Sequence, residues 1–211
     1  FLVAEKLLPT SQFLDLAGGT GKYIPHFSNF TDSYHLVDLS AKMLEFAKNK
    51  SAESNKITFT HQEQNKFLKN TKENTYDFVF SAMNPALESK EALVELNRIA
   101  NGNVGILRLI FDEDNLFSQV EQLYLPNQEQ NKEAQMLLYK VWLEELGWEF
   151  KSKKFRFFLS EKVSSQFFSD YFSDELSNAE LAALTQLFFS ETEIREMERL
   201  VIFELLYWEK C

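Results

Sequence analysis

The stretch FLDLAGGTGKYIPHF, residues 13–27, places a glycine-rich turn between a strand-like run and an amphipathic segment. The run QFLDLA (12–17) has the length and the near-continuous apolar character of a strand that is covered on both faces. Pro25 is tolerated in the first turns of the helix that we expect over 21–30. A glycine cluster at such a turn lets a ligand approach the backbone closely, so this stretch predicts a ligand site at the end of a strand.

The alternation of strand and helix continues beyond this turn. Four further strands are expected over 34–38, 56–60, 76–82 and 103–111. The helices between them include 88–100 and 40–50, the latter with Ser40 as N-cap. Met43, Leu44 and Ala47 are expected to line one face of the latter helix. Strands that alternate with helices form parallel crossovers, so the pattern predicts an α/β fold with a doubly wound, Rossmann-like sheet and helices on both faces.

The rhythm changes after Phe111. An irregular loop around Pro126 is expected, followed by a helix over 131–147 that Gly147 ends. The other elements that we expect are helices over 1–8, 161–172 and 178–189 and strands over 148–160 and 199–208. The predicted sheet thus has seven mostly parallel strands, with the last strand antiparallel. We expect a single domain over 1–211, with a cofactor-binding half (1–111) and a substrate or lid half (112–211).

Composition and charge narrow the choice of partners. The 211 residues hold 22 Lys and Arg against 32 Asp and Glu, a formal charge of −10. This disfavours nucleic acid as a partner, because a phosphate backbone is bound by a basic face. The apolar stretches are shorter than a membrane span, and no basic-then-apolar leader is evident, so a cytoplasmic protein is expected. Cys211 is the single cysteine, and no carboxylate–histidine spacing indicates a metal site.

Two common phosphate-binding motifs fit the glycine turn poorly. A P-loop needs Ser or Thr after Gly21-Lys22, and Tyr23 stands there instead. A dinucleotide-binding turn needs a third glycine, but that position falls on Ile24 or Lys22, depending on the alignment. The turn therefore predicts a different ligand.

LDLAGGTG, followed by VDLSAKMLEFAK, resembles the class I S-adenosylmethionine-dependent methyltransferases over about residues 12–110. Their first motif has an acidic residue followed by three alternating glycines, and a second acidic residue ends the next strand. Asp15 fills the first acidic position, Gly19 and Gly21 fill two glycine positions, and Ala17 replaces the remaining glycine, with Gly18 between them. The resemblance implies that these small residues and Asp15 bind S-adenosylmethionine and its product S-adenosylhomocysteine.

The resemblance also implies roles for residues at the other strand ends. Asp38 would accept hydrogen bonds from the ribose hydroxyls, and Leu39 would cover the adenine. In the loop after the third strand, Glu63 is the first choice for the adenine amine and Gln62 the second. Met43 and Ser81 complete the expected cofactor site.

Asn84-Pro85 follows the fourth strand and resembles the Asn-Pro-Pro-aromatic motif of amino-methyltransferases. It lies seven residues after Asp77 rather than five, and Ala86-Leu87 replace the Pro-aromatic pair, so methylation of nucleic-acid bases or glutamine is not expected. FSAMNPAL and the ending LLYWEK resemble a group of little-characterised bacterial small-molecule-type methyltransferases. On that likeness Met83, Asn84 and Pro85 would shape the substrate site. A plain Asn-Pro turn is the alternative.

The expected function is methyl transfer from S-adenosylmethionine to an O, N, S or C atom of a small-molecule acceptor. Two alternatives stay open: a cofactor-binding regulatory or interaction protein without methyl transfer, and a methyltransferase acting on RNA or protein. No residue is assigned as a catalytic base, and either a monomer or a homodimer is expected. The aromatic stripe Phe167, Phe168, Tyr171 and Phe172 is expected to belong to the core.

Overall fold

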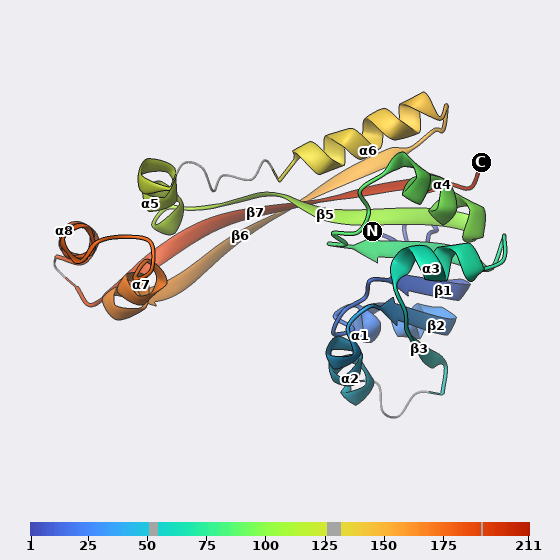
Figure 1. The fold of residues 1–211 in the computed structure, drawn as a ribbon, viewed down its shortest axis with the longest axis horizontal. Coiled ribbons are helices and arrows are strands. Elements are labelled where there is room, and N and C mark those ends of the chain that lie inside the picture. The colour runs from blue at the N-terminus through green and yellow to red at the C-terminus, as the bar shows by residue number, and fades with distance from the viewer. Residues whose placement is uncertain (51–54, 126–131, 191) are drawn as a thin grey trace. The chain divides into compact units, whose positions relative to one another are not determined.

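A computed structural model of the chain describes residues 1–50, 55–125, 132–190 and 192–211. Within them, seven strands form one sheet in the order β3-β2-β1-β4-β5-β7-β6 (Figure 1). The neighbours among the first five strands run parallel, and these strands are β1 (Thr10–Leu16), β2 (Thr31–Asp38), β3 (Ile57–His61), β4 (Tyr76–Ala82) and β5 (Ala100–Asp114). The strand order reverses at β1, which lies between β2 and β4. Ligands of doubly wound sheets bind at the carboxyl ends of strands at such a point.

The last two strands depart from the parallel pattern. β7 (Ile194–Glu209) runs antiparallel to β5, because the Lys210 amide donates to the Gly102 carbonyl (2.7 Å) while the Asn115 amide donates to the Glu198 carbonyl (3.0 Å). β6 (Lys151–Ser164) lies beside β7 at the edge of the sheet. This arrangement confirms the predicted α/β fold with a mostly parallel sheet and an antiparallel last strand.

The chain forms two compact units. Unit 1 comprises residues 1–108, 136–153 and 204–211, and unit 2 comprises residues 109–135 and 154–203. Strands β5, β6 and β7 contribute residues to both. The predicted halves are each continuous in sequence, whereas each unit is assembled from separate segments.

Unit 1 holds the parallel strands and most of the helices. Its helices are α1 (Ile24–Phe27), α2 (Ala41–Asn49), α3 (Gln64–Asn70), α4 (Lys90–Ile99) and most of α6 (Ala134–Glu145). Phe13 is fully buried, and its ring lies 4.9 Å from the Tyr34 ring and 5.4 Å from the Phe78 ring, between centroids. The near-continuous apolar runs of β1, β2 and β4 are therefore core strands, as predicted.

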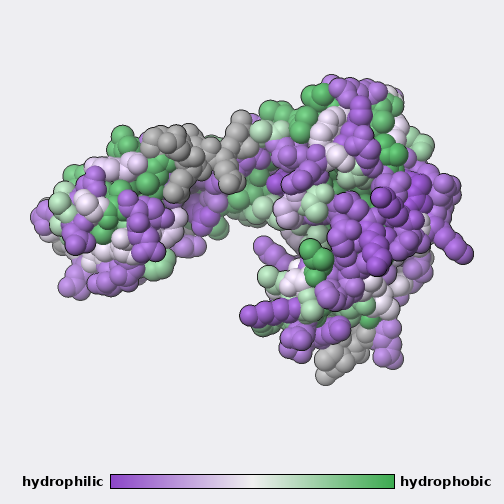
Figure 2. All heavy atoms as spheres, in the orientation of Figure 1, coloured by the Kyte–Doolittle hydropathy of each residue, from purple (hydrophilic) through white to green (hydrophobic). Residues whose placement is uncertain are grey.

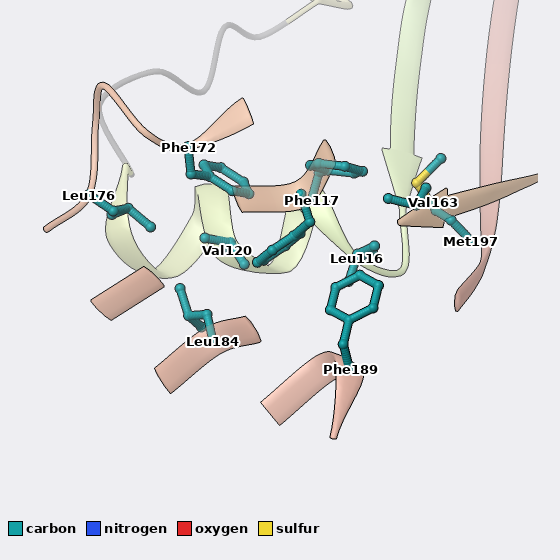
Figure 3. Packing of buried hydrophobic residues seen from close by; sticks show 10 residues of the cluster. Leu116, Phe117, Val120, Val163, Phe172, Leu176, Leu184, Phe189 and Met197 are labelled. Atoms are coloured by element: carbon teal, nitrogen blue, oxygen red, sulfur yellow. The ribbon is translucent and has the colours of Figure 1, made fainter. Parts of the chain in front are cut away.

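Unit 2 has its own hydrophobic core. Helices α5 (Phe117–Tyr124), α7 (Ser165–Tyr171) and α8 (Asn178–Phe189) enclose it together with parts of the long strands (Figure 3). Phe168 and Phe172 are fully buried there, whereas Phe167 and Tyr171 are half exposed. The predicted aromatic core stripe is thus confirmed for two of its four members. Hydrophobic side chains also reach the surface around these helices, among hydrophilic ones (Figure 2).

Several local predictions were wrong. Residues 1–8 form turns rather than a helix, and Lys6 has a left-handed backbone (φ +60°) that a helix does not accept. Helix α1 is one turn long and continues as a 3₁₀ helix over Ser28–Phe30, in place of one helix over 21–30. On α2, Leu44 and Ala47 are buried but Met43 is exposed.

The remaining C-terminal elements agree with the predictions in type, except that residues 161–164, expected to begin a helix, belong to β6. Helix α6 ends before Gly147, which has φ +72°. The loop expected around Pro126 lies outside the described residues. No helix in the part of the chain that the structure describes is long and apolar enough to cross a membrane.

Candidate functional site

The glycine turn follows β1 at the switch point of the sheet. Ala17, Gly19 and Gly21 all have left-handed backbones, with φ of +59°, +56° and +68°. A Cβ on Gly18 would lie 2.6 Å from Leu36 Cγ and 2.7 Å from Asp15 Cγ, closer than side chains pack. A Cβ on Gly19 would meet no atom within 4 Å. The turn is therefore closed toward the sheet at Gly18 and open at Gly19, where a ligand can approach the main chain.

Asp38 connects this turn to the end of β2. Its Oδ2 accepts a hydrogen bond from the Gly19 amide and its Oδ1 accepts one from the Ser40 amide, both at 2.8 Å. The Ser40 hydroxyl in turn accepts from the Met43 amide (3.3 Å) and caps α2, as predicted. Each carboxylate oxygen has a second lone pair, so Asp38 can accept further hydrogen bonds while holding the turn.

Asp15 lies beneath the turn and is fully buried. The Tyr34 hydroxyl donates to its Oδ2 at 2.5 Å, and its Oδ1 has no hydrogen-bond partner among the described residues. Burial raises the pKa of Asp15 to about 7, and the same burial together with the carboxyl of Asp15 raises the pKa of Tyr34. A carboxyl in this position supports the turn from below rather than reaching the surface.

A buried polar network shapes the turn after β4. The Asn84 amide nitrogen donates to Ser81 Oγ (2.9 Å) and Gln64 Oε1 (2.5 Å), and Ser81 Oγ donates to the Leu16 carbonyl (3.0 Å). Asn84 Oδ1 accepts from the Ala86 amide (2.9 Å), while Gln64 donates to the Ala86 carbonyl (3.0 Å). Asn84 therefore fixes the turn from inside. Its buried amide groups are satisfied by protein partners.

Met83 and Pro85, the two neighbours of Asn84 in this turn, are exposed, as is Ala86. Met83 has a left-handed backbone (φ +53°) and is 46% exposed. Arg108, near the middle of β5, donates to the Asn84 carbonyl (2.9 Å) and lies 3.4 Å from the hydroxyl of Tyr139. Its Nε is buried without a hydrogen-bond partner among the described residues. The turn is thus held from β5 by Arg108 and from α6 by Tyr139, whose hydroxyl donates to the Leu87 carbonyl (2.7 Å).

The loop after β3 uses its two expected adenine-binding residues differently. Glu63 caps α3, where it accepts from the Asn65 amide (2.7 Å) and the Lys66 amide (2.8 Å), and these hydrogen bonds lower its pKa. The Gln62 amide donates to the Asp38 carbonyl (3.1 Å), so Gln62 lies at the same sheet edge as Asp38. The geometry therefore leaves the Gln62 side chain freer to contact a ligand than the carboxylate of Glu63.

The expected site residues form one constellation at the carboxyl ends of β1, β2, β3 and β4. Leu39 is 66% exposed and Met43 is 43% exposed, so both offer apolar surface there. Sequence reasoning missed Gln64, Arg108 and Tyr139, which hold the β4 turn through contacts 20 to 52 residues apart in sequence. Arg108 interrupting the apolar run of β5 was the one visible signal. Within the described ranges, no three His, Cys, Asp or Glu side chains are grouped to hold a metal ion.

Comparison with known proteins agrees with this geometry. Residues 13–101 match the model of a family described as a methyltransferase domain. This match, together with the shared fold, supports a class I S-adenosylmethionine-dependent methyltransferase. The match spans the glycine turn, Asp38 and the turn after β4. No sequence among the curated proteins matches the chain significantly.

Solved structures share the fold at low sequence identity. A proposed type II methyltransferase from Anaeromyxobacter dehalogenans has 14% identity and a TM-score of 0.61, with 95% of this chain and 90% of that chain covered. An S-adenosylmethionine-dependent methyltransferase from Aquifex aeolicus has 15% identity and a TM-score of 0.52, covering 95% and 87%. A phosphoethanolamine N-methyltransferase from Haemonchus contortus, solved with S-adenosylhomocysteine, has 15% identity and a TM-score of 0.51, covering 95% and 49%.

Proposed function

We propose that this methyltransferase acts on a small-molecule acceptor, with the cofactor bound across the glycine turn. The observation that carries the cofactor assignment is the Asp38 carboxylate, which holds the open Gly19 main chain at 2.8 Å. A formal charge of −10 supports a small acceptor over a nucleic acid, whose phosphates would be repelled. Met83 and Pro85, on the resemblance to small-molecule enzymes, would face the acceptor, with Asn84 positioning them.

Each cofactor-binding residue has a distinct proposed role. Asp38 accepts from the ribose hydroxyls through its remaining lone pairs, and Leu39 and Met43 offer apolar surface to the adenine. Gln62 takes the adenine amine, in preference to Glu63, since the latter caps α3. Ala17, Gly18, Gly19 and Gly21 form the floor, while Asp15 and Ser81 support that floor from inside through Tyr34 and Leu16.

The bound cofactor supplies an electrophilic methyl group on a sulfonium. The protein contributes position: holding the acceptor in line with the carbon–sulfur bond can lower the barrier by about 7–11 kcal/mol. Asp15 has a pKa near neutrality but is fully buried, so it does not contact the acceptor in this arrangement. His61 bonds the Leu39 carbonyl (2.8 Å) and is committed to the loop. Catalysis through alignment alone is therefore the proposed mechanism.

Calorimetric titration of S-adenosylmethionine and S-adenosylhomocysteine tests the cofactor site. Wild type should bind both, and Asp38→Ala should weaken binding at least tenfold, about 1.4 kcal/mol. Asp32→Ala is the matched control, because Asp32 lies at the other end of β2 and bonds Ser11 (2.7 Å). A thermal unfolding curve for each variant shows whether a loss of binding is caused by a loss of folding. Equal weakening in both variants, or no binding by wild type, would refute the site.

Transfer of a labelled methyl group tests the acceptor class. The enzyme is incubated with labelled cofactor and a cell extract that has been divided by dialysis. Label in the dialysable fraction, with release of S-adenosylhomocysteine, would support a small acceptor. Label confined to RNA or protein would refute it. Cofactor binding with no transfer to any fraction would favour the regulatory alternative.

A further inference from the structure

Strand β6 forms an open edge of the sheet. It has 14 residues and, among the residues that the structure describes, one neighbouring strand, β7. Three successive apolar residues at its centre are exposed: Phe157 by 48%, Phe158 by 81% and Leu159 by 41%. Because successive side chains of a strand point to opposite faces, apolar groups are open on both faces of this edge. Open edges with apolar centres pair readily with further strands unless they are blocked.

The usual blocking devices are missing from the centre of β6. The strand holds no proline, and its charged residues flank the Phe157–Leu159 segment rather than interrupting it. Phe157 contacts Phe203 of β7 with its ring (6.2 Å between centroids), which fixes one face of the edge. The outer edge of β6 therefore offers backbone hydrogen-bonding groups and an apolar surface, in which the Phe157 ring is held by its contact with Phe203.

We propose that the β6 edge pairs with β6 of a second copy of this chain, antiparallel and two-fold symmetric about Phe157. In this register Phe157 faces itself, Arg156 faces Phe158, and Phe155 faces Leu159. Further out, Lys153 faces Glu161. The guanidinium of Arg156 is thus placed beside an aromatic ring, and a basic residue is placed beside the acidic one. The sequence of β6 is self-complementary in this register.

Charge excludes the neighbouring registers. A two-fold axis at Arg156 puts Arg156 opposite itself, and one at Phe158 puts Lys154 opposite Lys162. Like charges directly opposite on antiparallel strands are destabilising. The register at Phe157 places no like charges opposite each other along the strand. It also keeps the basic segment 151–156 of the two copies at opposite ends of the pair.

Disulfide cross-linking measures this register directly. Both test variants carry Cys211→Ser, because Cys211 is an exposed free thiol. Phe157→Cys should form a covalent dimer on mild oxidation, since directly opposite Cβ atoms are about 4.5–5.5 Å apart. Phe158→Cys is the matched control: it is the more exposed position, but its counterpart lies diagonally, about 7–8 Å away, too far for a disulfide. More dimer from Phe158→Cys, or none from either variant, would overturn the proposal.

Sedimentation equilibrium with charge variants provides an independent test. Phe158→Lys places like charges opposite Arg156 in both symmetric pairs, whereas Phe158→Glu places opposite charges there and removes the same ring. The dissociation constant of the dimer should be at least tenfold higher for Phe158→Lys than for Phe158→Glu. Leu187→Lys, on an exposed side chain of α8, should leave it unchanged. A wild type that stays monomeric at every concentration, or equal constants for the two Phe158 variants, would overturn the proposal.

Discussion

Replacing Gly18 with alanine should destabilise the protein through a steric clash in the floor of the glycine turn. The added Cβ would lie 2.6 Å from Leu36 Cγ and 2.7 Å from both Asp15 Cγ and Asp15 Oδ2. Leu36 and Asp15 are both fully buried, so neither can move into solvent. Overpacking of this kind costs about 1–3 kcal/mol. For a chain of this length, that lowers the melting temperature by about 2–12 °C, at about 2–4 °C for each kcal/mol.

A double-mutant cycle with Leu36→Ala identifies the clash as the cause. Removing Leu36 Cγ removes the closest contact, so the cost of Gly18→Ala should be smaller by about 0.5 kcal/mol or more in the Leu36→Ala background. Urea denaturation monitored by circular dichroism gives the four free energies of unfolding. Gly19→Ala is the control, because its Cβ meets no atom within 4 Å and its cost, about 1–2 kcal/mol, comes from a left-handed backbone.

The two glycines should also differ in ligand binding. Gly19→Ala places a methyl group in the open space proposed for the cofactor. In calorimetry it should therefore weaken the binding of S-adenosylmethionine even under conditions in which the variant is fully folded. Additive free energies in the Gly18–Leu36 cycle, or a Gly18→Ala variant as stable as wild type, would refute the steric reasoning.

Three further outcomes are expected. Because burial raises the pKa of Asp15 to about 7, its contribution to the free energy of unfolding is complete below about pH 4 and falls by about 1.4 kcal/mol per pH unit up to about pH 7. Urea titrations of Asp15→Asn across that range should lack this slope, and an unchanged slope would contradict the assignment. Lys140→Met leaves the fully buried carboxylate of Glu204 without its 2.6 Å partner and should cost about 3–5 kcal/mol in urea denaturation, most of which Glu204→Leu should restore. Phe168→Ala should destabilise unit 2 by about 3–5 kcal/mol in calorimetry, because the Phe168 ring is fully buried. Phe167→Ala should cost far less, because the Phe167 ring is half exposed. Equal losses would contradict the assignment of Phe168 alone to the core.

Elements were predicted best where several local signals agree. The bounds expected for β4 and α8, 76–82 and 178–189, are the observed ones. Helix α8 begins at Ser177, whose side chain forms a capping box with Glu180. The helix expected over 1–8 had only an apolar pattern, and so short a segment does not pay the cost of nucleation. The position of β7 between β5 and β6 depends on pairings far apart in sequence, which no local pattern contains.

The candidate site was likewise predicted where the local sequence marks it and missed where it depends on residues far apart in the chain. The glycine turn and Asp38 were predicted because both sit at strand ends, where the local sequence marks a turn. Gln64 was missed, since its buried amide meets Asn84 across 20 residues. The expected preference for Glu63 over Gln62 overlooked the competing use of a carboxylate as a helix cap.

The place of β7 in the sheet has a consequence for how the protein is made. Synthesis proceeds from the N-terminus, and domains generally begin to fold while the chain is still emerging from the ribosome. β5 and β6 are both neighbours of β7, which follows them in the chain. Until the 16 residues of β7 have left the ribosome, the place between β5 and β6 is empty, and the apolar strand β5 has no neighbour on that side. Until then, the open edges beside this gap in the sheet can pair with other strands.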